Sequence, residues 1–200
     1  MNESTRIQSS DTSRVSITIG IIVAVILAGV TLYFVFFAHT VKEAMTGFDP
    51  NRPVPDDATL RKRLSAEQYH VVRENGTETA FKNKLWDKFS PGIYVDIITR
   101  EPLFSSADKF DGGTGRPTFS KPISKDSIVE RDDTSYDMHR IEVRAKRSDA
   151  HLGHLIKDPT SPSGQRYAVN SAALYFIPTE DMEHEGYASY MSAVSPVAQK

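Results

Sequence analysis

Residues 15–38 form an uncharged run of 24 amino acids, VSITIGIIVAVILAGVTLYFVFFA, in a chain of 200 residues. An α-helix rises about 1.5 Å per residue, so this run is long enough to cross a hydrocarbon layer of about 30 Å. It lacks the polar stripe of a buried soluble helix, and aromatic residues gather at its C-terminal end, as they do at bilayer interfaces. We therefore expect residues 15–38 to form one transmembrane helix.

A cleaved signal peptide is the alternative interpretation of this run. The apolar region of such a peptide is about 7–15 residues long and ends in small residues, whereas this one is longer and ends in FFAHT. Arg6 and Arg14 precede the run, and Lys42 and Arg52 follow it, which slightly favours a cytoplasmic N-terminus. We expect a single-pass protein of the cell membrane with an extracytoplasmic soluble domain.

The remainder of the chain divides by composition. Residues 1–14 are a polar N-terminal segment, and residues 39–58 are a Pro-rich linker that contains FDPNRPVPDD. A globular domain is expected over residues 59–192, followed by a flexible tail over residues 193–200.

Helix signals occur early in the globular domain and strand signals follow them. Ser65 and Gln68 form a capping box that predicts a helix through about Arg73, ended by Asn75-Gly76. A short second helix is expected to carry Leu85, Trp86 and Phe89 into the core. The strand signals are GIYVDII, EPLF, HRIEVRA, HLGHLI and QRYAVNSAALYFIP. The pattern predicts a mainly β domain with N-terminal helices.

Composition excludes several classes of function. The chain has no cysteine, which excludes disulfides, cysteine zinc sites and thiol nucleophiles. Its 24 basic and 26 acidic residues give no electrostatic reason to expect nucleic acid binding.

Five blocks of the domain resemble the type B methionine sulfoxide reductases, which reduce the R epimer of methionine sulfoxide. The blocks are LSAEQYHVVRENGTE, GIYVDIITREPLFSSADKFDGGTGRPTFSKPI, DMHRIEVRAK, HLGH and RYAVNSAALYFIP. The resemblance covers roughly residues 60–192 and implies two small antiparallel sheets in a tent-like β structure, with helices at the edge. It also implies the zinc-free subgroup, because VDIITREP and AKRSDAHL stand where zinc-binding members carry two CxxC pairs.

The family motif R-Y/F-C-x-N reads Arg166-Tyr167-Ala168-Val169-Asn170 in this chain. In the family, the cysteine thiolate attacks the sulfoxide sulfur and becomes a sulfenic acid. Ala168 therefore occupies the position of the missing nucleophile. The resemblance assigns the charge that favours a thiolate to Arg166, and it matches Asn170 to the asparagine of the motif.

The HLGH block contributes two more candidate catalytic residues. The resemblance implies that His151 and His154 line the site and assist the sulfoxide oxygen, and that Asp158 supports them. A metal site at this HxxH pair is disfavoured, because no cysteine or adjacent glutamate completes it.

The candidate substrate-binding residues depart from the family pattern. Arg116 replaces the tryptophan that packs against the substrate methyl group, and Thr114 stands where many members have a resolving cysteine. Ile156 replaces a usual phenylalanine, while Phe119 keeps the aromatic residue of its block. An arginine at position 116 would make an apolar pocket polar.

Two functions from different classes remain open. The first is a membrane-tethered reductase that repairs oxidised methionine in proteins, draws on a thioredoxin-like reductant and needs no metal cofactor. It is expected to be inactive with alanine at position 168, whether that alanine arose naturally or by engineering. The second is a non-catalytic pseudoenzyme, a tethered binding or scaffolding domain that uses the retained pocket.

Overall fold

The computed structural model describes residues 19–35, 47–161 and 163–194. Residues 19–35 are helical and expose large apolar side chains. Among the described residues, no helix combines the length and hydropathy that a membrane span requires. The predicted span, residues 15–38, lies partly outside the described residues, and residues 1–14 lie wholly outside them. A second compact unit begins at Gly47.

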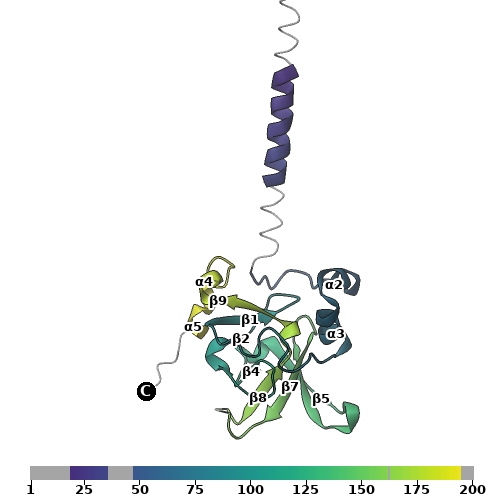
Figure 1. The fold of residues 1–200 in the computed structure, drawn as a ribbon, viewed down its shortest axis with the longest axis vertical. Coiled ribbons are helices and arrows are strands. Elements are labelled where there is room, and N and C mark those ends of the chain that lie inside the picture. The colour runs from purple at the N-terminus through teal and green to yellow at the C-terminus, as the bar shows by residue number, and fades with distance from the viewer. Residues whose placement is uncertain (1–18, 36–46, 162, 195–200) are drawn as a thin grey trace, which may run out of the picture. The chain divides into compact units, whose positions relative to one another are not determined.

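Two antiparallel sheets form this second unit (Figure 1). The smaller sheet has the order β2-β1-β9 and consists of β1 (Gly92–Asp96), β2 (Pro102–Ser105) and β9 (Leu174–Pro178). The larger has the order β3-β4-β8-β7-β6-β5 and consists of β3 (Lys109–Phe110), β4 (Thr118–Phe119), β5 (Ile128–Asp133), β6 (Arg140–Ala145), β7 (His151–Lys157) and β8 (Gln165–Val169). The expectation of a mainly β domain with two antiparallel sheets is confirmed.

Short α-helices precede and follow the strands in this unit, and 3₁₀ turns lie between strands and near its C-terminal end. They are α2 (Asp57–Arg63), α3 (Ala66–Glu74), α4 (Thr179–Met182), α5 (Met191–Val194) and the 3₁₀ turns η1 (Ser106–Asp108), η2 (Lys125–Ser127), η3 (Ser135–Asp137), η4 (Ser171–Ala173) and η5 (Ala188–Tyr190). The predicted capping box opens α3: Ser65 Oγ accepts from the Gln68 amide, and Gln68 Oε1 accepts from the Ser65 amide. Asn75 ends α3 in the left-handed conformation, at φ 55°, as its sequence predicts.

Two sequence predictions of secondary structure are wrong. Residues 85–89 form turns rather than a helix, and although Leu85 is buried, Phe89 is 51% exposed. The apolar run of residues 165–178 is two strands rather than one. β8 and β9 belong to different sheets, because η4 turns the chain between them.

The domain boundaries also differ from those expected from composition. Phe48 packs against the core of this unit, and Arg147 Nη1 donates to the carbonyl of Asp49 at 2.6 Å. These contacts attach the later part of the predicted linker to the domain. The domain likewise continues past residue 192, because Val194 is buried and Ser105 Oγ donates to the carbonyl of Ala193. Residues 39–46 and 195–200 lie outside the described residues.

The smaller sheet is buried on both faces. Tyr94 and Phe104 point from it toward the larger sheet, where the Phe104 ring stacks on Phe119 with 4.5 Å between centroids. Ile93 and Val95, on the opposite face of β1, pack with Ile177, Met182, Tyr187 and Val194. The core between the sheets thus occupies one face of the larger sheet, and the opposite face remains available for a site.

Candidate functional site

A row of four residues crosses the middle of the larger sheet. Glu142 in β6 pairs with His154 in β7, His154 pairs with Ala168 in β8, and Ala168 pairs with Thr118 in β4. Residues paired directly across antiparallel strands lie on the same face. This register therefore places a histidine beside Ala168, although the two positions are separated by a loop in sequence.

A bulge and a glycine allow the strands to approach closely at this row. The β6·β7 pairing shifts between Val143 and Arg144, so that Leu152 lies between two ladder positions. Its carbonyl accepts from both the backbone amide and the side-chain amide of Asn170. At Gly153, a Cβ atom would lie 2.2 Å from the carbonyl oxygen of Ala168. Only glycine fits this position.

A cavity of about 260 Å³ opens beside the row. Six residues supply its polar and charged lining, four of which the sequence predicted as site residues, and four further residues supply backbone and apolar groups. The lining consists of Thr77, Thr114, Arg116, Arg140, His154 and Asn170, with Gly153, Leu155, Ile156 and Ala168. The structure thus brings Ala168, His154, Asn170, Arg116, Thr114 and Ile156 together.

Each histidine is held by a carboxylate from the neighbouring strands. His154 Nε2 lies 2.7 Å from Asp133 Oδ2, and His151 Nδ1 lies 2.6 Å from Glu142 Oε1. The two rings meet edge to face at 5.5 Å. Hydrogen bonds from Ser135 and then His154 lower the pKa of Asp133, so this carboxylate is anionic at neutral pH and orients the ring of His154.

His151 lies just outside the cavity that Ala168 lines. It lines an adjoining hollow of about 710 Å³ that shares Thr77, Arg140 and His154 with that cavity. Burial lowers the pKa of His151, although its bond to Glu142 acts in the opposite direction. The ring is therefore neutral at neutral pH and leaves one nitrogen for the hollow.

Asp158 does not support the histidines, contrary to expectation. Its Oδ2 pairs with Arg166 Nη1 at 3.0 Å, and its Oδ1 accepts from Thr160. Arg166 also donates to the carbonyl of Gly112 at 3.1 Å and does not line the cavity. The pair instead holds the loop that leads to Thr114.

Phe119 is also misplaced by the sequence prediction. It follows Thr118 in β4, so its side chain lies on the opposite face of the sheet from the one that Ala168 and Thr118 share. It is fully buried among Tyr94, Phe104 and other core residues. Phe119 thus supports the sheet beneath the site and does not line the cavity.

Residues 64–178 match the SelR domain family. The chain belongs to the SelR domain family. This is the family of methionine-R-sulfoxide reductases, which act on methionine sulfoxide in proteins. The match includes every residue that lines the cavity beside Ala168.

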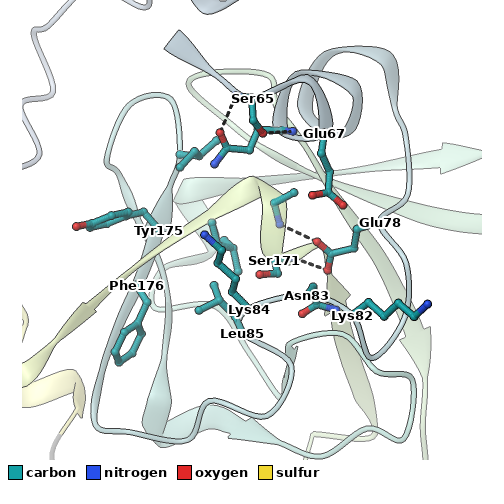
Figure 2. Close-up of a pocket in the computed structure, with 14 residues that line it drawn as sticks. Ser65, Glu67, Glu78, Lys82, Asn83, Lys84, Leu85, Ser171, Tyr175 and Phe176 are labelled. Atoms are coloured by element: carbon teal, nitrogen blue, oxygen red, sulfur yellow. Dashed lines mark hydrogen bonds between the residues drawn. The ribbon is translucent and has the colours of Figure 1, made fainter.

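Glu78 is a buried carboxylate of this SelR domain that holds the backbone of η4, directly after Asn170. Its two oxygens accept from the backbone amides of Ser171 and Ala172, at 2.6 and 2.8 Å (Figure 2). Its own backbone amide donates to Asn170 Oδ1 at 3.3 Å. Burial raises the pKa of Glu78, and the two backbone amides and Arg116 oppose that rise. Glu78 therefore couples the start of η4 to Asn170 and Arg116.

Arg116 enters the SelR cavity as the sequence suggested. It lines the cavity together with Ile156 and Ala168, and its Nη2 donates to the carbonyl of Glu78 at 3.3 Å. The loop before it is held closely, because a Cβ atom at Gly115 would lie 2.5 Å from the amide nitrogen of Phe81. Its guanidinium brings positive charge to the lining of the cavity.

Sequence reasoning missed Asp133, Glu142, Arg140 and Glu78. Arg140, Glu142 and Arg144 occupy alternate positions of β6, so charge on one face of a strand was the available signal. Asp133 and Glu78 gave no such signal, because the site residues that they bond, His154 and Ser171, lie 21 and 93 residues away along the chain. Across residues 19–35, 47–161 and 163–194, no group of three His, Asp or Glu side chains is arranged to hold a metal ion.

Proposed function

We propose that this chain is a membrane-anchored methionine-R-sulfoxide reductase family protein that keeps the reductase pocket and lacks its thiol. The observation that carries the proposal is the cavity in which Ala168 meets His154 and Asn170. By resemblance to the SelR family, Ala168 stands at the position of the nucleophilic cysteine. His154 and Asn170 stand at positions from which a side chain could hydrogen-bond the sulfoxide oxygen.

The reaction that such a pocket serves explains why turnover is not expected. A thiolate attacks the sulfoxide sulfur, the oxygen passes to the thiol sulfur as a sulfenic acid, and methionine leaves reduced. A thioredoxin-like dithiol then reduces the sulfenic acid and releases water. This chain has no cysteine anywhere in its 200 residues, so neither step can begin.

The zinc-free subgroup and the membrane anchor are parts of the same proposal. The absence of cysteine supports the first, since zinc-binding members hold the metal through two CxxC pairs. The uncharged run of residues 15–38 supports the second, with the soluble domain on the extracytoplasmic side of the cell membrane. Oxidised methionine in surface proteins is the substrate that this placement implies.

The second candidate function is a non-catalytic binding or scaffolding domain. It is favoured by the position of Arg116, which lines the cavity that would otherwise hold the substrate methyl group. A charged side chain weakens an apolar methyl site and creates a polar one. The retained pocket would then hold a partner rather than a sulfoxide.

Restoring the sulfur tests the proposal. The variant Ala168→Cys is assayed with dithiothreitol against separate R and S sulfoxides, with the unaltered chain as the blank. Ala107→Cys is the matched control, because Ala107 is exposed and does not line the cavity. R-selective turnover by Ala168→Cys alone would support the reductase ancestry of the site.

The opposite results are equally informative. Equal turnover by Ala168→Cys and Ala107→Cys would contradict the assignment of position 168, because any added thiol would then suffice. A folded Ala168→Cys variant without turnover would favour the binding domain and would implicate Arg116 in the loss of the reductase pocket.

A further inference from the structure

Three buried hydrogen-bond donors around the 260 Å³ cavity have no partner among the described residues. They are Thr114 Oγ1, Arg116 Nε and Arg140 Nε. Buried polar groups in native proteins are nearly always paired with protein, water or ligand. Thr114 and Arg116 belong to the loop between β3 and β4, Arg140 begins β6, and all three residues line the same cavity. Unsatisfied donors on three of its lining residues indicate that the polar wall of this cavity lacks acceptors.

Positive charge predominates in the same cavity. Arg116 and Arg140 line it, and its described lining includes no aspartate or glutamate. Asp133 lies outside the lining, where its Oδ2 accepts from Arg140 at 2.6 Å and from His154 at 2.7 Å. Glu78 faces Arg116, but both of its oxygens are occupied by backbone amides. Arg116 therefore retains N–H donors for an incoming anion, while its charge also interacts with that of Glu78.

The cavity also has an apolar side. Ile156 and Ala168, which lie on the same face as His154, contribute apolar side chains to its lining. Its volume of about 260 Å³ lies just below the usual range for pockets that hold drug-sized ligands. This combination suits a charged group on a few methylenes and excludes a bulky ligand.

We propose that this cavity binds a carboxylate carried on a short aliphatic stem, with Arg116 as its principal cation. This inference deepens the binding-domain candidate above and rests on it. A planar carboxylate can accept two hydrogen bonds from one guanidinium and a third from a hydroxyl such as that of Thr114. A methyl sulfoxide offers one oxygen and no net charge, so it gains less from a guanidinium than an anion does.

A matched pair of probes tests the charge directly. N-acetyl-glutamyl amide and N-acetyl-glutaminyl amide have nearly the same shape, and only the first is anionic at neutral pH. Each is titrated into the full chain in a non-ionic detergent at constant ionic strength, and binding is followed by NMR chemical shifts. Propionate forms a third arm, which separates a free small acid from an acidic side chain. We expect the acidic probes to saturate the protein and the amide probe to bind at least about tenfold more weakly.

Variants assign the binding to the cavity. Arg116→Met should raise the Kd of the acidic probes by about tenfold or more, since it removes the charge and the fork of donors. Thr114→Val removes only a hydroxyl that has no partner, so it provides a milder second test should Arg116→Met fail to fold. Arg131→Met is the control, because Arg131 is half exposed and pairs with Asp149 away from the cavity. It should change the Kd by less than about twofold.

Three results would overturn the inference: equal binding of the glutamyl and glutaminyl probes, no saturation by either acid, or an unchanged Kd in both Arg116→Met and Thr114→Val. Failure here is distinguishable from failure of the proposed function. R-selective turnover by Ala168→Cys without acid binding would retain the reductase ancestry and reject only the carboxylate ligand. Absence of both turnover and acid binding would reject the carboxylate ligand and a retained reductase pocket, while membership of the SelR domain family would stand.

Discussion

Replacing Glu78 by alanine should destabilise the domain by about 2–4 kcal/mol. The substitution leaves the amides of Ser171 and Ala172 without acceptors, and each buried donor left unpaired costs about 1–3 kcal/mol. The sum is about 2–6 kcal/mol, and the lower half is expected because the variant also removes the cost of burying a carboxylate. That cost is evident in the raised pKa of Glu78.

Urea unfolding of the full chain, followed through the single tryptophan, measures this change. Trp86 is a suitable reporter because its ring contacts Phe81 within the loop that precedes β1. Glu67→Ala is the control: Glu67 lines the same hollow as Glu78 but is exposed (Figure 2), and its loss should cost less than about 1 kcal/mol. A loss in Glu78→Ala no larger than that in Glu67→Ala would refute the reasoning.

The pH dependence of the same site provides an independent check. A carboxyl group whose pKa is raised in the folded state binds more protons folded than unfolded, so its contribution to stability falls as pH rises through that raised pKa. The free energy of unfolding of the wild type, minus that of Glu78→Gln, should therefore decrease as pH rises above the ordinary value of 4.5. A difference that grows with pH would show that Glu78 is better stabilised as the anion than its burial implies.

Two further predictions concern the strand that carries the histidines. Gly153→Ala places a Cβ atom 2.2 Å from the carbonyl of Ala168 and should destabilise the domain by about 3 kcal/mol or more, measured by urea unfolding. Gly113→Ala, which has a positive φ but open space, should cost about 1–2 kcal/mol, and equal losses would disprove the clash. Because burial lowers the pKa of His151, stability should be lost as pH falls below its ordinary value of 6.5. Thermal unfolding should show that acidification destabilises the His151→Asn variant less than the wild type. Equal acid-induced losses of stability in His151→Asn and in the exposed-site variant His139→Asn would contradict this origin.

The sequence predicted those elements whose signals act within a few residues. The capping box of Ser65 and Gln68 and the left-handed Asn75 are fixed within one helical turn, and the structure has both. The run of residues 165–178 contains no glycine or proline before its last residue, so nothing local indicated that the chain leaves one sheet and enters the other. Strand exchange between sheets is decided by long-range packing.

The same distinction applies to the site. The resemblance of the HLGH and RYAVN blocks grouped His154, Ala168 and Asn170, and the structure places these three in the lining of one cavity. It could not identify the carboxylates that hold the histidines, because Asp133 lies 21 residues before His154 and reaches it only through the register of β5, β6 and β7. Asp158, near in sequence, pairs with Arg166 instead.

Strand β8 has a consequence for how such a domain changes over generations. Tyr167 and Val169 are buried in the core, whereas Arg166, Ala168 and Asn170 alternate with them toward the opposite face. The side chains that pack the core and the one at position 168 that faces the cavity therefore alternate along one strand. A substitution at position 168 changes the cavity without removing a side chain from the core. The architecture thus separates the tolerance of the core to mutation from that of the pocket.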